Sequence, residues 1–362
     1  MTRNSFIPIL LTAISLECAA WGQTPFFPNN SILNSLQSIT DSTAPSNGDL
    51  NPYGVAFVPA GFPAGGSIVP GDVLVSNFNA SSNLEGTGTT IVSISPTGQQ
   101  TLFATSALIG LDTALGVLSR GFVVVGNVPV TYPDNVSTPG QGSLQIFDRN
   151  GHLVATLNDP NLLDSPWDLT IHDQGSAAQV FVSNLLSGTV TRLNLMISNS
   201  GVALVSKTRI GSGFGHQIIP AIVAVGPTGL AYDPIRDTLY VASTADNRIF
   251  GIGDAGRRTT SADTGFVVFA DQTHLHGPLG LTLSPNGNLI TANGDGVNAG
   301  GTQNDLVEFT QGGFLVATYQ LDGGAPGAAF GVASTISQGA VRFAAVDDVL
   351  NTLTIWTLRA PF

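Results

Sequence analysis

Three of the five histidines in this 362-residue sequence lie in short polar segments where they could act as general bases or bind a metal ion. His216 lies in "GFGHQII", and His274 and His276 lie in "THLHGPLG". Alternate side chains of an extended segment point the same way, so His274 and His276 could bind one transition metal. Such a site needs a third ligand, and no neighbouring residue offers one. The three histidines are therefore candidates for a catalytic base, with exposed turn histidines as the alternative.

A second candidate site is the loop "ANGDGVNAGGTQND", in which asparagine and aspartate alternate with glycine. Calcium takes roughly 6–8 oxygen ligands. Asp295 and Asn298 in this loop, together with Asp347, could supply some of them. The loop lacks the acidic residue that ends an EF-hand loop, so a glycine-rich hairpin without an ion is the alternative. If the loop is a metal site, we expect a divalent cation, calcium or magnesium.

Several catalytic motifs and partners are excluded. The sequence holds no Gly-x-Ser-x-Gly segment, no His-Glu-x-x-His segment and no Gly-Lys phosphate loop. It has 24 acidic residues against 12 basic ones, and its net charge is −12. A nucleic acid requires a basic surface, so we expect no nucleic-acid partner. Anionic membrane surfaces are disfavoured for the same reason.

The elements that must position these residues come from an internal repeat. Six segments share a small or polar start followed by apolar alternation: Asn51–Pro59, Thr113–Gly121, Ser165–Asp173, Gly226–Pro234, Gly277–Pro285 and Ala328–Ile336. The equivalent residues in them are Gly54, Gly116, Asp168, Gly229, Gly280 and Gly331. The spacings between these residues, 62, 52, 61, 51 and 51, define six units of similar length.

Each unit continues with further short strands. An apolar second strand such as "LYVAST" is followed by a third such as "NRIFGIGD", and most units add a fourth. Four short antiparallel strands per unit, at a period of roughly 50 residues, are typical of propeller blades. The sequence predicts an all-β fold, a six-bladed β-propeller of four-stranded antiparallel blades. The sixth unit ends after its third strand, and Ser31–Thr40 is the candidate for the fourth strand that closes the ring.

The fourth unit resembles the NHL and YVTN repeats of known propellers. Its segment "GLAYDPIRDTLYVASTADNRIFGI" has the glycine-led strand, the Asp-Pro turn, the "YVA" strand and the Asn-Arg-Ile turn of the NHL pattern. The chain is similar to secreted bacterial propellers without an assigned activity. Propeller lactonases of the gluconolactonase type use a glutamate at the start of the first blade as a metal ligand, and this chain has Asn51 there. Propeller lyases built from similar repeats use a histidine and a glutamate with magnesium, and the sequence shows no clear counterpart.

When the six units are aligned, another set of polar residues falls at equivalent positions in the units. The residue that ends each second strand is small and polar: Asn77, Asn127, Asn184, Ser243, Asn293 and Asp347. The loops that follow reach the face that propellers use for ligands, so this polar collar could surround a ligand or an ion. Bonds to the backbone of the following turn are the structural alternative. Tyr53 and Trp167 could stack on a ring-bearing ligand or pack between blades.

The first 22 residues have the pattern of an export signal. Arg3 precedes an apolar run, Phe6–Leu16, which is too short for a membrane span, and Ala20 and Gly22 offer small-residue cleavage sites. The sole cysteine, Cys18, lies within this segment, so we expect no disulfide in the mature chain. The predicted organisation is a signal peptide at 1–22, an N-terminal segment with the closing strand at 23–48, and the propeller at 49–362.

These observations predict a secreted or periplasmic, monomeric propeller. We expect it to bind a small molecule, a glycan or a protein at the channel-mouth face. Two insertions rich in proline and glycine, Val58–Asp72 and Val128–Gly142, lengthen loops of the first two units, where specificity is often placed. The alternative is a metal-dependent lactonase-like hydrolase or a lyase. The sequence leaves open whether the protein is an enzyme.

Overall fold

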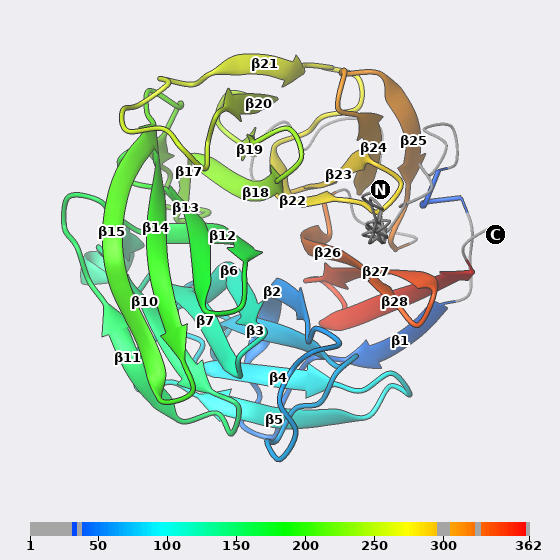
Figure 1. The fold of residues 1–362 in the computed structure, drawn as a ribbon. Helices are drawn as coiled ribbons and strands as arrows, with labels where there is room; N and C mark the ends of the chain where they lie inside the picture. Colours follow the sequence, from blue (N-terminus) through cyan, green and yellow to red (C-terminus); the bar gives the residue numbers. More distant parts are fainter. Residues whose placement is uncertain (1–30, 35–37, 295–304, 323–326, 360–362) are drawn as a thin grey trace, which may run out of the picture.

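The computed structural model describes residues 31–34, 38–294, 305–322 and 327–359. Six four-stranded antiparallel sheets are arranged around a central axis (Figure 1). Within the described ranges the only helical element is one 3-10 turn, Pro133–Asn135, and no helix there is long and apolar enough to cross a membrane. The predicted six-bladed β-propeller is confirmed.

Five blades follow the order of the chain from the axis outwards. The first two are β2 (Leu50–Phe57), β3 (Val73–Asn79), β4 (Thr90–Ile94), β5 (Gln100–Thr105), and β6 (Leu111–Leu118), β7 (Phe122–Asn127), β10 (Ser143–Asp148), β11 (Leu153–Leu157). The next two are β12 (Pro166–Asp173), β13 (Ala177–Asn184), β14 (Thr189–Ser198), β15 (Gly201–Gly211), and β18 (Pro227–Asp233), β19 (Thr238–Ser243), β20 (Arg248–Gly253), β21 (Phe266–Phe269). The fifth is β22 (Pro278–Leu283), β23 (Asn288–Asn293), β24 (Leu306–Thr310) and β25 (Leu315–Tyr319).

The sixth blade joins strands from both ends of the described chain. It contains β26 (Ala329–Ser337), β27 (Ala340–Asp347), β28 (Thr352–Arg359) and β1 (Ser38–Ser42). β1 pairs antiparallel with β28, from Ser38 opposite Trp356 to Ser42 opposite Thr352. The segment predicted for this strand, Ser31–Thr40, overlaps β1 only in its last residues. That this pairing holds the ring closed stays a prediction.

Burial explains the sequence pattern of the blades. The second strands β3, β7, β19 and β23 are buried along their whole length, because neighbouring blades cover both faces of each sheet. Fully buried strands need continuous apolar runs rather than alternation. The fourth strands lie at the rim and keep many side chains exposed, as in β11.

The innermost strands β2, β6, β12, β18, β22 and β26 line the axis, and each contacts the next, with β26 returning to β2. Their close approach explains the glycine of the repeat. A Cβ atom on Gly331 would lie 1.9 Å from the carbonyl oxygen of Tyr53 in the next blade. One on Gly280 would lie 2.3 Å from that of Phe330. Only glycine lets these backbones pass so closely.

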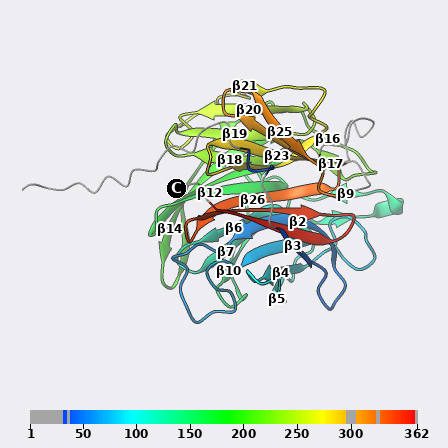
Figure 2. The same ribbon diagram turned by 90° about the vertical axis from the view of Figure 1, so that its right-hand side faces the viewer.

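Two small hairpins are added to the blades. β8 (Val130–Thr131) pairs with β9 (Thr138–Pro139), and β16 (Gln217–Ile218) pairs with β17 (Ala224–Val225). Figure 2 shows β9, β16 and β17 together at one end of the ring. The hydroxyl of Ser137 donates to the carbonyl of Pro220 at 2.7 Å, so the two hairpins are in contact.

Candidate functional site

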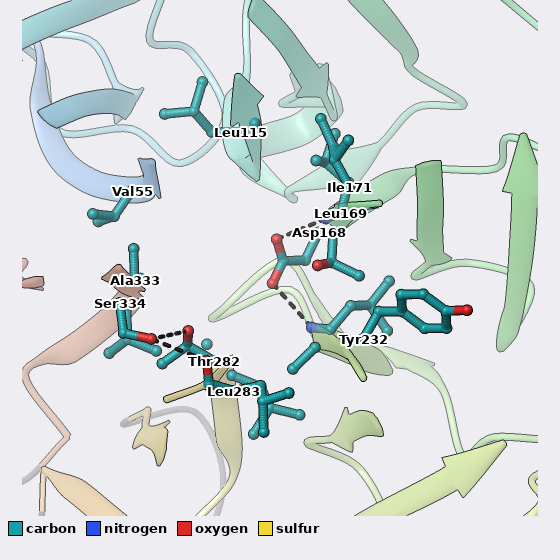
Figure 3. Close-up of a pocket in the computed structure, with 18 of the residues that line it drawn as sticks. Val55, Leu115, Asp168, Leu169, Ile171, Tyr232, Thr282, Leu283, Ala333 and Ser334 are labelled. Carbon is teal, nitrogen blue, oxygen red and sulfur yellow. Dashed lines mark hydrogen bonds between the residues drawn. The ribbon is translucent and has the colours of Figure 1, made fainter. Parts of the chain in front are cut away.

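The inner strands enclose a cavity of about 290 Å³ on the propeller axis, partly open to solvent. All six blades contribute residues from their inner strand (Figure 3). Aliphatic side chains such as Val55, Leu115 and Ile171 line it, but most of the exposed lining surface is polar. Hydroxyl groups are added by Thr282 and Ser334, which bond to each other at 3.0 Å. The cavity can therefore hold a small molecule that makes both polar and apolar contacts.

Asp168 supplies the only carboxyl group among the described residues that line this cavity. It occupies the repeat position that is glycine in the other five units. The residue is only 9% exposed. In Figure 3 its carboxyl group lies between the inner strands rather than within a blade. A buried carboxyl group that lines a cavity is a candidate for a functional residue.

Three strands hold Asp168 in place. Its backbone N–H donates to the Ser183 hydroxyl on β13 at 3.1 Å, and the same hydroxyl donates to the carbonyl of Thr228 in the next blade at 2.7 Å. The carboxyl oxygens accept from the backbone N–H of Leu169 at 2.7 Å and of Leu230 at 3.3 Å. The carboxyl group is therefore oriented before any ligand arrives.

Burial raises the pKa of Asp168 well above its ordinary value, and the two backbone N–H groups only partly oppose this rise. Tyr232, the other ionisable residue of the lining, has its hydroxyl turned to Asp237 at 2.8 Å. Burial and that carboxylate raise the pKa of Tyr232, so it stays neutral. Asp168 can thus donate a hydrogen bond when protonated, or pair with a cation when ionised.

The other end of the channel is closed by aromatic side chains. Tyr53 stacks on Phe78 and Phe330 with ring centroids 4.7 and 4.5 Å away, and Trp167 packs edge-on against Tyr53 at 5.7 Å. Tyr53 and Trp167 are 6% and 3% exposed. Val223, beside β17, belongs to the same buried cluster. Tyr53 and Trp167 are thus brought together in a packed cluster that also borders a small pocket of about 40 Å³, and their role in ligand binding stays a prediction.

The predicted collar residues are buried, none more than 2% exposed. Four of them donate through the side-chain amide to a backbone carbonyl in the connection leading into their own blade, at 2.8–3.2 Å: Asn77, Asn127, Asn184 and Asn293. Ser243 donates to Asp246, and Asp347 accepts from the N–H of Leu350. These bonds give the collar a structural role, and its role as a ligand site stays a prediction.

The three candidate histidines lie outside the channel lining. Nδ1 of His274 bonds to Asp271 at 2.6 Å, and Nε2 of His276 lies 3.2 Å from the carbonyl oxygen of Thr273. His216 is exposed, with Nδ1 3.0 Å from the carbonyl oxygen of Phe214. Each of these histidines therefore contacts a different neighbouring group through the ring nitrogen named here.

The proposed metal ligands are only partly within the described ranges. Asp295 and Asn298 lie outside them. Burial raises the pKa of Asp347, and the nearby charges of Asp322 and Asp305 add to the rise. Within the ranges that the structure covers, no three His, Cys, Asp or Glu side chains are placed to hold one metal ion.

Comparison with known proteins supports the fold. The chain matches no known protein family and no curated protein sequence. Luciferin-regenerating enzyme is 13% identical with a TM-score of 0.52, over 90% of this chain and 96% of that chain. Regucalcin, a calcium-binding protein from Agrobacterium tumefaciens, is 15% identical with a TM-score of 0.52, over 86% and 92%. Virginiamycin B lyase from Staphylococcus aureus is 12% identical with a TM-score of 0.50, over 89% and 100%.

At these identities the likeness establishes the fold alone. The protein belongs to the propeller class, and the resemblance to NHL and YVTN repeats is compatible with that class.

Sequence reasoning did not single out Asp168 as a site residue. The signal for it was present, because aspartate replaces glycine at one of six equivalent positions. Only the structure shows that this repeat position faces the propeller axis.

Proposed function

We propose that this protein acts outside the cytoplasm and binds a small organic cation in its central channel. The observation that carries the proposal is the buried carboxyl group of Asp168, which lines the axial cavity with no basic side chain beside it among the described lining residues. The location rests on the export-signal pattern of residues 1–22. The ligand enters from the end of the channel opposite the aromatic cluster of Tyr53 and Trp167.

Charge favours a cation over other ligands. A buried carboxylate is costly unless it is paired, and no lysine or arginine is among the described residues that line the cavity. The net charge of −12 adds a negative potential that attracts cations. The cavity volume of about 290 Å³ is at the small end of ligand pockets, which span roughly 300–1,000 Å³, so a single-ring amine has a suitable size.

Titration calorimetry with three probes of similar shape tests the proposal. Benzylamine is cationic, benzyl alcohol is neutral and benzoate is anionic. A hydrogen bond to a charged group contributes about 1.5–3 kcal/mol, so benzylamine should bind roughly 10- to 100-fold more tightly than benzyl alcohol. Benzoate should not bind. The affinity for benzylamine should fall as the pH drops below the raised pKa of Asp168, because the carboxyl group must then lose a proton.

Asp168→Asn should remove the preference for benzylamine and leave the weak binding of benzyl alcohol unchanged. Asp263→Asn is the matched control, since it removes the same charge at an exposed turn residue. The proposal fails if benzoate binds as well as benzylamine, or if Asp168→Asn retains the preference for the amine.

A metal-dependent hydrolase or lyase is the second candidate. It draws support from three acidic residues: the charge of Asp322 raises the pKa of Asp305, and the charges of Asp322 and Asp305 raise the pKa of Asp347. Thermal unfolding after chelation, with and without calcium or magnesium, tests it. A rise in the midpoint that Asp347→Asn abolishes supports a metal site. If neither ion raises the midpoint, this candidate is removed.

A further inference from the structure

A second pocket, separate from the channel, lies where turns of the first three blades meet. Its volume is about 490 Å³. The lining comes from the β6–β7 turn with Arg120, the β10–β11 turn with Arg149 and Asn150, and the β14–β15 turn with Asn199 and Ser200. Pro63, from the insertion Val58–Asp72, completes the wall.

The pocket holds two positive charges in a strongly acidic chain. Arg120 and Arg149 both line it, and neither is in an ion pair between described residues. Arg120 donates to the side-chain oxygen of Asn199 at 3.4 Å. Asp148 also lines the pocket, but its carboxylate accepts from the backbone N–H groups of Asn150 and His152, at 2.8 and 3.0 Å, and bonds to the His152 ring. Asp148 is the only acidic residue among the described residues of the lining, and it stabilises its own turn.

The insertion in the first blade is fixed against this pocket. Phe62 and Ile68 anchor it in the core, at 4% and 0% exposure. The N–H of Ser67 donates to the carbonyl of Arg149 at 3.0 Å. A Cβ atom on Gly66 would lie 2.5 Å from that same carbonyl oxygen, so glycine is needed for the contact. The wall of the pocket is thus formed in advance of binding, which lowers the cost of ordering it.

We propose that this pocket binds an organic oxyanion, a carboxylate or sulfate group carried on a sugar-sized body. Arginine guanidinium groups match the planar fork of a carboxylate or sulfate. Asn150, Asn199 and Ser200 offer hydrogen bonds to hydroxyl groups, and Val154 offers an apolar surface. The volume exceeds that of a bare inorganic ion, so the body of the ligand contributes to affinity.

Titration calorimetry with glucuronate, glucose and inorganic sulfate separates the contributions. We expect glucuronate to bind at least tenfold more tightly than either glucose or sulfate, with an affinity that falls as salt is added. Arg120→Gln and Arg149→Gln should each weaken glucuronate binding at least tenfold, and the double variant should abolish it. Arg248→Gln is the control, because this exposed arginine lies on β20 in the fourth blade, far along the chain from the pocket.

Three results would overturn the inference. Equal affinity for sulfate and glucuronate would mean that the pocket takes a bare ion only. Unchanged binding in the double variant would place the glucuronate elsewhere. Equal weakening by Arg248→Gln would mean that the anion responds only to the overall charge. Far-UV circular dichroism of each variant excludes loss of the fold as the cause.

Discussion

Replacing Asp168 by asparagine should change how the stability of the propeller depends on pH. The carboxyl group of Asp168 is buried, and burial raises its pKa well above the ordinary value. As the pH rises, an acid with a raised pKa in the folded state keeps its proton at pH values where the same acid in the unfolded chain has already lost it. Its contribution to stability is therefore complete below the ordinary pKa and is lost as the pH rises through the raised pKa. Asparagine has no such proton.

The magnitude follows from the proton count. The ordinary pKa of aspartate is about 3.9. Between that value and the raised pKa, the folded protein binds nearly one proton more than the unfolded chain. The free energy of unfolding then falls by about 1.4 kcal/mol per pH unit through this residue. In Asp168→Asn this loss is absent. Asp72 and Asp305 also have raised pKa values, but they are present in both proteins and cancel in the difference.

Urea unfolding from about pH 4 to about pH 8 measures the difference. The buried tryptophans Trp167 and Trp356 provide the fluorescence signal. The difference in unfolding free energy should move in favour of the variant as the pH rises, and then level off above the raised pKa. Parallel curves for the two proteins would refute the reasoning, because they would mean that Asp168 titrates normally in the folded state.

Three further predictions concern the elements that hold the ring. Glu308→Gln should lower the unfolding free energy in urea by about 1–3 kcal/mol, because the fully buried carboxylate accepts five hydrogen bonds, including those from Ser31 and Ile32, and the glutamine amide replaces one acceptor oxygen by a donor. An unchanged unfolding free energy would contradict this. Gly331→Ala should lower the unfolding free energy by about 3 kcal/mol or more in the same assay, because the added Cβ would clash with the carbonyl oxygen of Tyr53. Gly253→Ala is the control: no atom lies within 4 Å of its added Cβ, so the loss should be less than about 1 kcal/mol. Deleting residues 31–42 should lower the thermal midpoint and promote oligomers in light scattering, because β28 becomes an open edge; a monomer with an unchanged midpoint would show that β1 does not hold the ring closed.

The blades could be predicted from the sequence because their signals are local. Six repeats, continuous apolar second strands and turn residues are all visible in the chain itself, and each follows from burial between neighbouring blades. The glycine of the repeat was visible too. The reason for this glycine was not visible in the sequence, because it is a contact between the last blade and the first: a Cβ atom on Gly331 would lie 1.9 Å from the carbonyl oxygen of Tyr53.

The candidate site was less predictable because its contacts join residues that are far apart in the chain. Asn184 has the same appearance in the sequence whether it faces a ligand or a backbone carbonyl, and the structure directs its amide to Leu162. Trp167 was open to two interpretations, and it packs within the aromatic cluster. In both cases the partner of the side chain lies outside the segment that contains the residue, so the local sequence does not predict it.

The sequence by itself determined the number of blades, their four strands and the position of Asp168 in the repeat. The tertiary structure decided which of these residues face the axis, which end of the channel is closed, and that Arg120 and Arg149 line one pocket. The physical reason is that strand formation depends on periodicity over a few residues. A binding site depends on distances between strands that are tens or hundreds of residues apart, and the chain records these only through the packing of the complete ring.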